Sequence, residues 1–111
     1  ENGFSLYKNA KGRFLQVSGL KVKFCPTSPL GSRVKSLYIA GKPIDPEKEY
    51  SLVASNYLIK GGDGFTMLKQ NRDIPSKKLN LLLWEITRSY IENKKYISPE
   101  IEGRIVVDCN N

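Results

Sequence analysis

The sequence contains no histidine among its 111 residues, so it lacks the commonest general base and a leading metal ligand. Nucleophilic catalysis usually needs a base beside the nucleophile, and metal-dependent phosphate hydrolysis needs clustered histidine and carboxylate ligands. The one close group of carboxylates, Asp45, Glu47 and Glu49, lies in a proline-containing turn that is better interpreted as a solvated loop. We therefore expect no catalytic residue, no metal site and no cofactor in this chain, and hence no enzyme activity of its own.

Long apolar runs and nucleotide-binding motifs are also absent. The runs at 81–84 and 105–107 fall far short of the roughly 20 apolar residues that span a bilayer, so no transmembrane segment is expected. The chain has no Walker sequence, and the glycine-rich stretch 61–64 is not a Rossmann fingerprint. It has no Asn-X-Ser/Thr sequon either, so glycosylation gives no support to secretion.

Positive charge is in excess, with eighteen lysines and arginines against eleven acidic residues and a net charge of +7. Such a charge attracts anionic partners over long range, and salt screens the attraction. The basic residues are scattered and not interleaved with aromatics, so sequence-specific nucleic-acid binding is not expected. We expect an extracellular protein or another anionic ligand as partner; the alternative is a solvated surface that only aids solubility. The candidate surface for such a partner comprises Lys21, Lys23, Arg33 and Lys35.

The two cysteines bear on the compartment in which the protein works. The sequence begins at Glu1, which fits a processed or a trimmed chain. Cys25 and Cys109 end two apparent strands, and an even count in a secreted, extracellular chain is compatible with one disulfide. Two free, buried thiols are the alternative.

Strands are expected to make up most of the chain outside one helix. Leu20, Val22 and Phe24 alternate with two lysines, as a half-buried strand requires. Proline and glycine mark a loop at 26–32 and a turn at 41–43. Further strands are expected at 14–17, 33–40, 50–54 and 103–108.

A helix is expected from Ser76, a possible N-cap, to about Lys94. Its apolar stripe is predicted to be core, with Trp84 beside the stripe as a possible second contact surface. The glycines within 55–65 predict a loop, either a tight corner or a ligand-facing wall. The predicted fold is α+β, a mixed sheet of about four to five strands packed against one long helix, in a single domain spanning 1–111. The stripe consists of Leu79, Leu82, Leu83, Ile86 and Tyr90.

Three blocks of sequence together resemble the C-terminal domain of the 5′-nucleotidase and apyrase family. They are 12–22, 50–65 with the stretch Gly-Gly-Asp-Gly-Phe at its end, and 102–105. Their order and spacing match across roughly residues 12 to 108, and three blocks in register are more specific than one glycine-rich stretch. The resemblance implies that domain's fold, shortened at its N-terminal side and without the catalytic metallophosphatase domain.

The resemblance also implies a site. In that family the residue at the position of Tyr57 stacks on the nucleobase, and the aspartate at the position of Asp63 hydrogen-bonds the ribose. The family's second stacking aromatic and its phosphate-binding arginines lie before the first block and have no counterpart here; Phe4 or Tyr7 could substitute for the aromatic. The alternative is an inherited corner that binds no ligand. The candidate nucleoside site comprises Tyr57, Gly61, Gly62, Asp63 and Phe65.

Three functions compete at this stage. The first is a secreted, non-catalytic binding or effector protein derived from such a domain, for which the family's salivary apyrases suggest a vasodilator or anti-haemostatic role. The second is a fragment of a secreted 5′-nucleotidase or apyrase that needs its metal domain for hydrolysis. The third is a weak nucleotide or nucleoside binder.

Overall fold

The computed structural model describes residues 1–9, 12–70 and 77–110. Its packing divides the chain into two compact units, residues 1–72 with 103–111 and residues 73–102. The sheet and the candidate site both belong to the first unit, and the longest helix belongs to the second.

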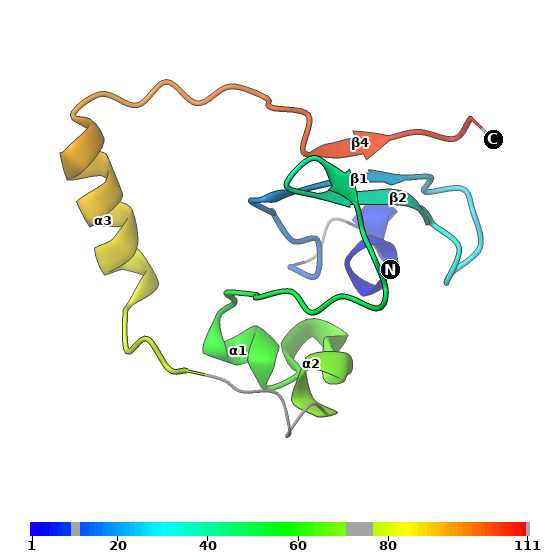
Figure 1. The fold of residues 1–111 in the computed structure, drawn as a ribbon, viewed down its shortest axis with the longest axis horizontal. Helices are drawn as coiled ribbons and strands as arrows, with labels where there is room; N and C mark the ends of the chain where they lie inside the picture. Colours follow the sequence, from blue (N-terminus) through cyan, green and yellow to red (C-terminus); the bar gives the residue numbers. More distant parts are fainter. Residues whose placement is uncertain (10–11, 71–76, 111) are drawn as a thin grey trace. The chain divides into compact units, whose positions relative to one another are not determined.

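A four-stranded mixed sheet forms the centre of the first unit (Figure 1). Strand β1 pairs antiparallel with β2, which pairs antiparallel with β3, while β4 returns to pair parallel with β1. The spatial order is β3-β2-β1-β4, and the last strand therefore lies beside the first. This arrangement confirms the predicted α+β fold with a mixed sheet. The strands span β1 Leu20–Phe24, β2 Val34–Ile39, β3 Lys42–Pro43 and β4 Ile105–Val107.

The alternation of β1 decides which face of the sheet is buried. Val22 and Phe24 are 5% and 1% exposed, whereas Lys21 and Lys23 point the other way and are exposed. A period of two places these residues on opposite faces, as the sequence predicts. Phe24 is thus the most deeply buried large side chain among the described residues.

The N-terminal segment packs its aromatic rings around Phe24. It contains two short 3-10 helices, Asn2–Phe4 and Tyr7–Asn9. The ring of Phe4 stacks on that of Phe24 with centroids 4.0 Å apart, and the ring of Tyr7 meets it edge-on at 5.1 Å. These contacts give the first unit an aromatic cluster as its core.

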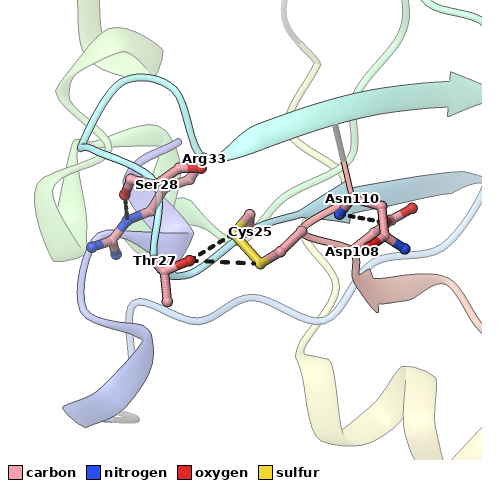
Figure 2. Close-up of a disulfide and its surroundings, with 7 residues drawn as sticks. Cys25, Thr27, Ser28, Arg33, Asp108 and Asn110 are labelled. Carbon is pink, nitrogen blue, oxygen red and sulfur yellow. Dashed lines mark hydrogen bonds between the residues drawn. A yellow bond between two sulfur atoms is a disulfide. The ribbon is translucent and has the colours of Figure 1, made fainter.

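A disulfide joins Cys25 and Cys109, which confirms the predicted bridge (Figure 2). Their Cα atoms lie 4.8 Å apart because each cysteine follows one of two paired strands, β1 and β4. The Thr27 hydroxyl lies 3.0 Å from Cys25 Sγ and 3.7 Å from Cys109 Sγ. The bridge closes a sequence separation of 84 residues just after the C-terminal ends of β1 and β4.

Two predicted strands are wrong. Residues 14–17 and 50–54 form no ladder, and residues 42–43, predicted as part of a turn, instead form β3. The side chains of Leu52 and Val53 are 64% and 81% exposed. Apolar and β-branched residues supply propensity, but a strand also needs a partner for its backbone, and pairing is decided by tertiary structure.

The predicted loop at 55–65 is also partly wrong, because it contains two short helical turns. Helix α1 spans Asn56–Ile59, and its N-cap residue Ser55 accepts a hydrogen bond from the backbone N–H of Leu58 at 3.4 Å. A 3-10 turn covers Gly62–Gly64, and helix α2 follows at Thr66–Gln70. A serine cap and a left-handed glycine at Gly61 therefore build helix, turn and helix where glycine content alone suggests a loop.

The second unit contains helix α3, Leu83–Lys94. The predicted cap Ser76 lies outside the described residues, and the helix starts later than predicted, since 77–82 are not helical and Asn80 has a φ of 50°. The start is set by Glu85, whose carboxylate accepts a hydrogen bond from the backbone N–H of Leu82. None of the described helices is long and apolar enough to cross a membrane.

The prediction that the helix stripe is core is wrong for this structure. Among the described residues of the second unit, α3 is the only helix or strand, so this unit contains no second element that could cover the apolar stripe. Trp84, beside the stripe, is also exposed. The exposed fractions of the stripe run from 46% to 77%, for Leu79, Leu82, Leu83, Ile86 and Tyr90.

Candidate functional site

Tyr57 and Asp63 form a closed pair of hydrogen bonds at the corner between α1 and the following 3-10 turn. The Tyr57 hydroxyl donates to Asp63 Oδ1 at 3.1 Å, and it accepts from the backbone N–H of Asp63 at 3.2 Å. The hydroxyl is thus held at two points of the same residue. The two residues that the family resemblance singles out are in direct contact.

Gly62 determines where the Tyr57 ring can lie. A Cβ built on Gly62 would come within 2.5 Å of Cε1 and Cζ of Tyr57, a distance that real Cβ atoms essentially never show. The ring therefore rests on the bare backbone of Gly62, which is the close approach that glycine allows. Tyr57 is nevertheless 59% exposed, so much of its aromatic surface is available for a ligand.

Asp63 is held by the turn and by the N-terminal segment. Its φ of 50° lies in the left-handed region, where aspartate is one of the few tolerated residues. The Asn2 side-chain amide donates to the Asp63 carbonyl oxygen at 3.0 Å. A Cβ on Gly12 would lie 3.4 Å from Asp63 Oδ2, so this second carboxylate oxygen faces the backbone near Gly12. Within the described residues, Oδ2 accepts no hydrogen bond.

Gly61 and Phe65 lie at the two ends of the 3-10 turn that carries Asp63. Gly61 adopts a φ of 87°, which turns the chain from α1 into the 3-10 turn. Phe65 closes that turn, with its backbone N–H donating to the Gly62 carbonyl oxygen at 3.0 Å, and it is partly buried. The structure therefore brings all five predicted residues into one corner, with Tyr57 and Asp63 presenting side-chain chemistry.

Both aromatics of the N-terminal segment that could substitute as a second stacking face are engaged with the aromatic core. Phe4 and Tyr7 both contact the core residue Phe24. The segment instead contributes Asn2, which sequence reasoning missed because an isolated asparagine carries no pattern. Gly12 was within reach of the sequence, since it opens the first block of the family resemblance, although its closeness to Asp63 is a tertiary contact.

The candidate anionic-partner surface is partly engaged in intramolecular contacts. Lys23 forms an ion pair with Asp108 at 3.0 Å, and this hydrogen bond raises the pKa of Lys23 and lowers that of Asp108. Arg33 donates to the Ser28 carbonyl oxygen at 3.1 Å and to the carbonyl oxygens of Phe4 and Ser5, so it ties loop and N-terminal segment together.

Lys21 and Lys35 are the exposed members of that surface whose side chains make no hydrogen bond or ion pair with the residues that the structure describes. Whether the four residues bind an anionic partner stays a prediction. No cluster of three or more potential metal ligands occurs in the described part of the chain.

The comparisons with known proteins agree on one family. The family model described as "5'-nucleotidase, C-terminal domain" matches residues 1–70. The chain is 37% identical over 111 residues to the 5'-nucleotidase of Diplobatis ommata, covering 90% of this chain and 18% of that protein. It is 30% identical over 116 residues to the apyrase of Aedes aegypti, covering 96% of this chain and 20% of that protein.

A solved structure agrees in fold. The crystal structure of the 5'-nucleotidase precursor from Thermus thermophilus has a TM-score of 0.89 and 35% identity, covering 99% of this chain and 22% of that chain. This chain thus spans about a fifth of the length of the relatives it matches. Because the family model covers more than half of the chain, from the N-terminal segment through the Tyr57–Asp63 corner, the chain belongs to the family of the 5′-nucleotidase C-terminal domain.

Proposed function

We propose that this chain is the nucleoside-contacting part of a 5′-nucleotidase or apyrase, and that nucleotide hydrolysis needs residues outside it. The observation that carries the proposal is the exposed Tyr57 ring with the Asp63 carboxylate at its hydroxyl edge. An exposed aromatic face offers a nucleobase stacking worth roughly 1 to 3 kcal/mol. A carboxylate at its edge accepts hydrogen bonds from sugar hydroxyls.

The division of labour follows from the composition. The chain has no histidine, and a two-metal phosphatase centre needs clustered nitrogen and carboxylate ligands. Its relatives are about five times longer and are named 5'-nucleotidase or apyrase. We infer that binding of the nucleoside and chemistry on the phosphates belong to different parts of such a protein.

A secreted location is part of the proposal. The Cys25–Cys109 disulfide supports it, because disulfides form and persist mainly in oxidising compartments. Mass spectrometry of natively produced protein under alkylating conditions is the direct check. Two alkylated thiols in that material would contradict this location.

A second candidate is a secreted, non-catalytic effector that binds an extracellular anionic partner, for example in vasodilation or haemostasis. The excess of positive charge and the exposed Lys21 and Lys35 favour it. The exposed apolar surface favours the fragment instead, since only Val22, Phe24 and Cys25 are buried among the described residues. The length of the encoding reading frame separates the two candidates, because a short frame with its own signal peptide supports the effector and a long frame supports the fragment.

Binding of adenosine to the purified chain tests the proposal. With one stacking face and one carboxylate, we expect a dissociation constant of roughly 0.1 mM or weaker after the entropy of association. Binding is followed by the NMR chemical-shift changes of the chain as adenosine is added, and Tyr57→Ala should abolish these changes. Tyr90→Ala is the matched control, because Tyr90 is 57% exposed, close to the 59% of Tyr57, and lies on α3.

Two results would contradict the proposal. Binding that survives both Tyr57→Ala and Asp63→Ala places the ligand elsewhere, for example on the surface of Lys21, Lys23, Arg33 and Lys35. Release of phosphate from AMP by the highly purified chain would show that its own residues suffice for the chemistry.

A further inference from the structure

We propose that the Tyr57 hydroxyl sets the sugar selectivity of this corner, by competing with one hydroxyl of a ribose for the Asp63 carboxylate. The inference rests on the proposed nucleoside-binding function and adds a specificity-determining group to it. Tyr57 is then more than a stacking platform, since its ring contacts the base and its hydroxyl limits what Asp63 can recognise.

The contact geometry provides the competition. A carboxylate recognises a vicinal diol most simply with one hydroxyl on each oxygen. Here the Tyr57 hydroxyl already donates to Oδ1 at 3.1 Å and is itself fixed by the Asp63 backbone N–H at 3.2 Å. A ribose hydroxyl that approaches Oδ1 must displace the phenol or share the oxygen with it. Displacement of the Tyr57 hydroxyl also breaks its hydrogen bond with the Asp63 backbone N–H, so the ring is no longer held to the turn.

The second carboxylate oxygen remains for the ligand. Oδ2 has no hydrogen-bond donor within the described residues, and it faces Gly12, where a side chain would begin 3.4 Å away. The absence of a Cβ at Gly12 leaves room beside Oδ2. We therefore expect the corner to recognise one sugar hydroxyl strongly and the neighbouring hydroxyl weakly.

Three nucleosides distinguish the two hydroxyls: adenosine, 2′-deoxyadenosine and 3′-deoxyadenosine. Dissociation constants are measured by chemical-shift titration of the intact chain, its Tyr57→Phe variant and its Gly12→Ala variant. The intact chain should bind one deoxynucleoside roughly tenfold more weakly than adenosine and the other within about threefold, because a hydrogen bond to a charged group is worth more than a shared one. Tyr57→Phe should discriminate against both deoxynucleosides roughly tenfold, since Oδ1 becomes available.

Ratios between ligands isolate the hydroxyl's effect. Loss of the hydrogen bonds that hold the ring changes the affinity of all three nucleosides by the same factor. Competition at Asp63 changes the three affinities unequally and therefore changes their ratios. Gly12→Ala should reduce the single discrimination of the intact chain, because the added Cβ would lie 3.4 Å from Oδ2 and occupy space beside that oxygen. Tyr90→Phe is the control and should leave every ratio unchanged.

Several outcomes overturn the inference while leaving the proposed function intact. If the intact chain discriminates against both deoxynucleosides, or against neither, the Tyr57 hydroxyl does not compete at Oδ1. Either result contradicts the inference without any variant. A Tyr57→Phe chain with the same ratios as the intact chain does so too. Absence of adenosine binding by the intact chain instead rejects the proposed function, and the inference with it.

Discussion

The ring of Phe4 stacks on the ring of Phe24, with centroids 4.0 Å apart and planes inclined by 14°. Phe24 belongs to the central strand β1, whereas Phe4 belongs to a 3-10 turn of the N-terminal segment. The same segment places Asn2 on the Asp63 carbonyl oxygen. The aromatic core and the candidate site are therefore connected through the first residues of the chain.

Phe24→Ala is expected to be strongly destabilising. Removing a buried phenylalanine leaves a cavity and costs about 3 to 5 kcal/mol, which is a large part of a small domain's stability. Urea denaturation followed by circular dichroism measures the change. Leu30→Ala is the control, because Leu30 is 68% exposed and its loss should change the free energy of unfolding by about 0.5 kcal/mol or less. Equal effects of the two substitutions would mean that Phe24 is not the centre of the core.

Removal of the disulfide is expected to lower stability substantially. The bridge closes a separation of 84 residues, for which the chain-entropy model gives about 4 to 5 kcal/mol, mainly through the unfolded state. A Cys25→Ala, Cys109→Ala double variant should therefore unfold at much lower denaturant concentration. Lys23→Met is the comparison close to the bridge, since it removes the exposed ion pair to Asp108 and leaves the bridge. A double variant as stable as Lys23→Met would contradict a major contribution from the bridge.

In the first unit, the sequence pattern predicted the features that depend on alternation along a strand and on residues at the ends of strands. The alternating lysines of β1, the last strand within 103–108 and the cysteine pair were all recognisable. The expected strand at 50–54 failed because pairing partners are not written in a local segment. The predicted helix start was wrong for a similar reason. The start depends on the hydrogen bond from the backbone N–H of Leu82 to the Glu85 carboxylate and on the positive φ of Asn80, and the apolar stripe reveals neither.

The candidate site, too, could be predicted from the sequence only in part. Tyr57 and Asp63 could be named from the family resemblance, but their mutual hydrogen bonds could not. That contact depends on the ring resting on Gly62 and on the positive φ of Asp63. The participation of Asn2 and Gly12 is a consequence of tertiary packing. No residue pattern marks Asn2, and the sequence block that Gly12 opens does not indicate its closeness to Asp63.

Stability is expected to fall in acid partly through Glu1. Burial tends to raise the pKa of Glu1, but the backbone N–H groups of Val34 and Arg33, which donate to its carboxylate, outweigh burial and lower the pKa below 4.5. A carboxylate with a lowered pKa in the folded state contributes stability above its unfolded pKa, and this contribution is lost as the pH falls through the folded value. Glu1→Gln should therefore reduce the pH dependence of the melting temperature below about pH 4.5.

The matched comparison for Glu1 is Glu47→Gln, because the Glu47 carboxylate lies in an exposed turn and accepts no hydrogen bond from a backbone N–H of residues 1–9, 12–70 or 77–110. Melting curves at several pH values between neutral and acid measure both variants. Parallel curves for the intact chain and Glu1→Gln would show that the contacts to Val34 and Arg33 carry no pH-dependent stability.

The apolar surface of α3 is expected to make the isolated chain bind hydrophobic dyes and self-associate. Leu83 is 77% exposed and Ile86 46% exposed, and exposed apolar patches of this kind mark interaction sites or aggregation liabilities. A Leu83→Lys, Ile86→Lys double variant should lower dye fluorescence and shift sedimentation toward the monomer. Because both side chains are solvent-exposed, each substitution should change the free energy of unfolding by only about 0.5 kcal/mol. Ser89→Lys adds charge to the same helix without removing apolar surface, so it should leave dye binding unchanged. A loss of several kcal/mol in the double variant would mean that these side chains are buried in the folded chain, as their amphipathic spacing alone predicts.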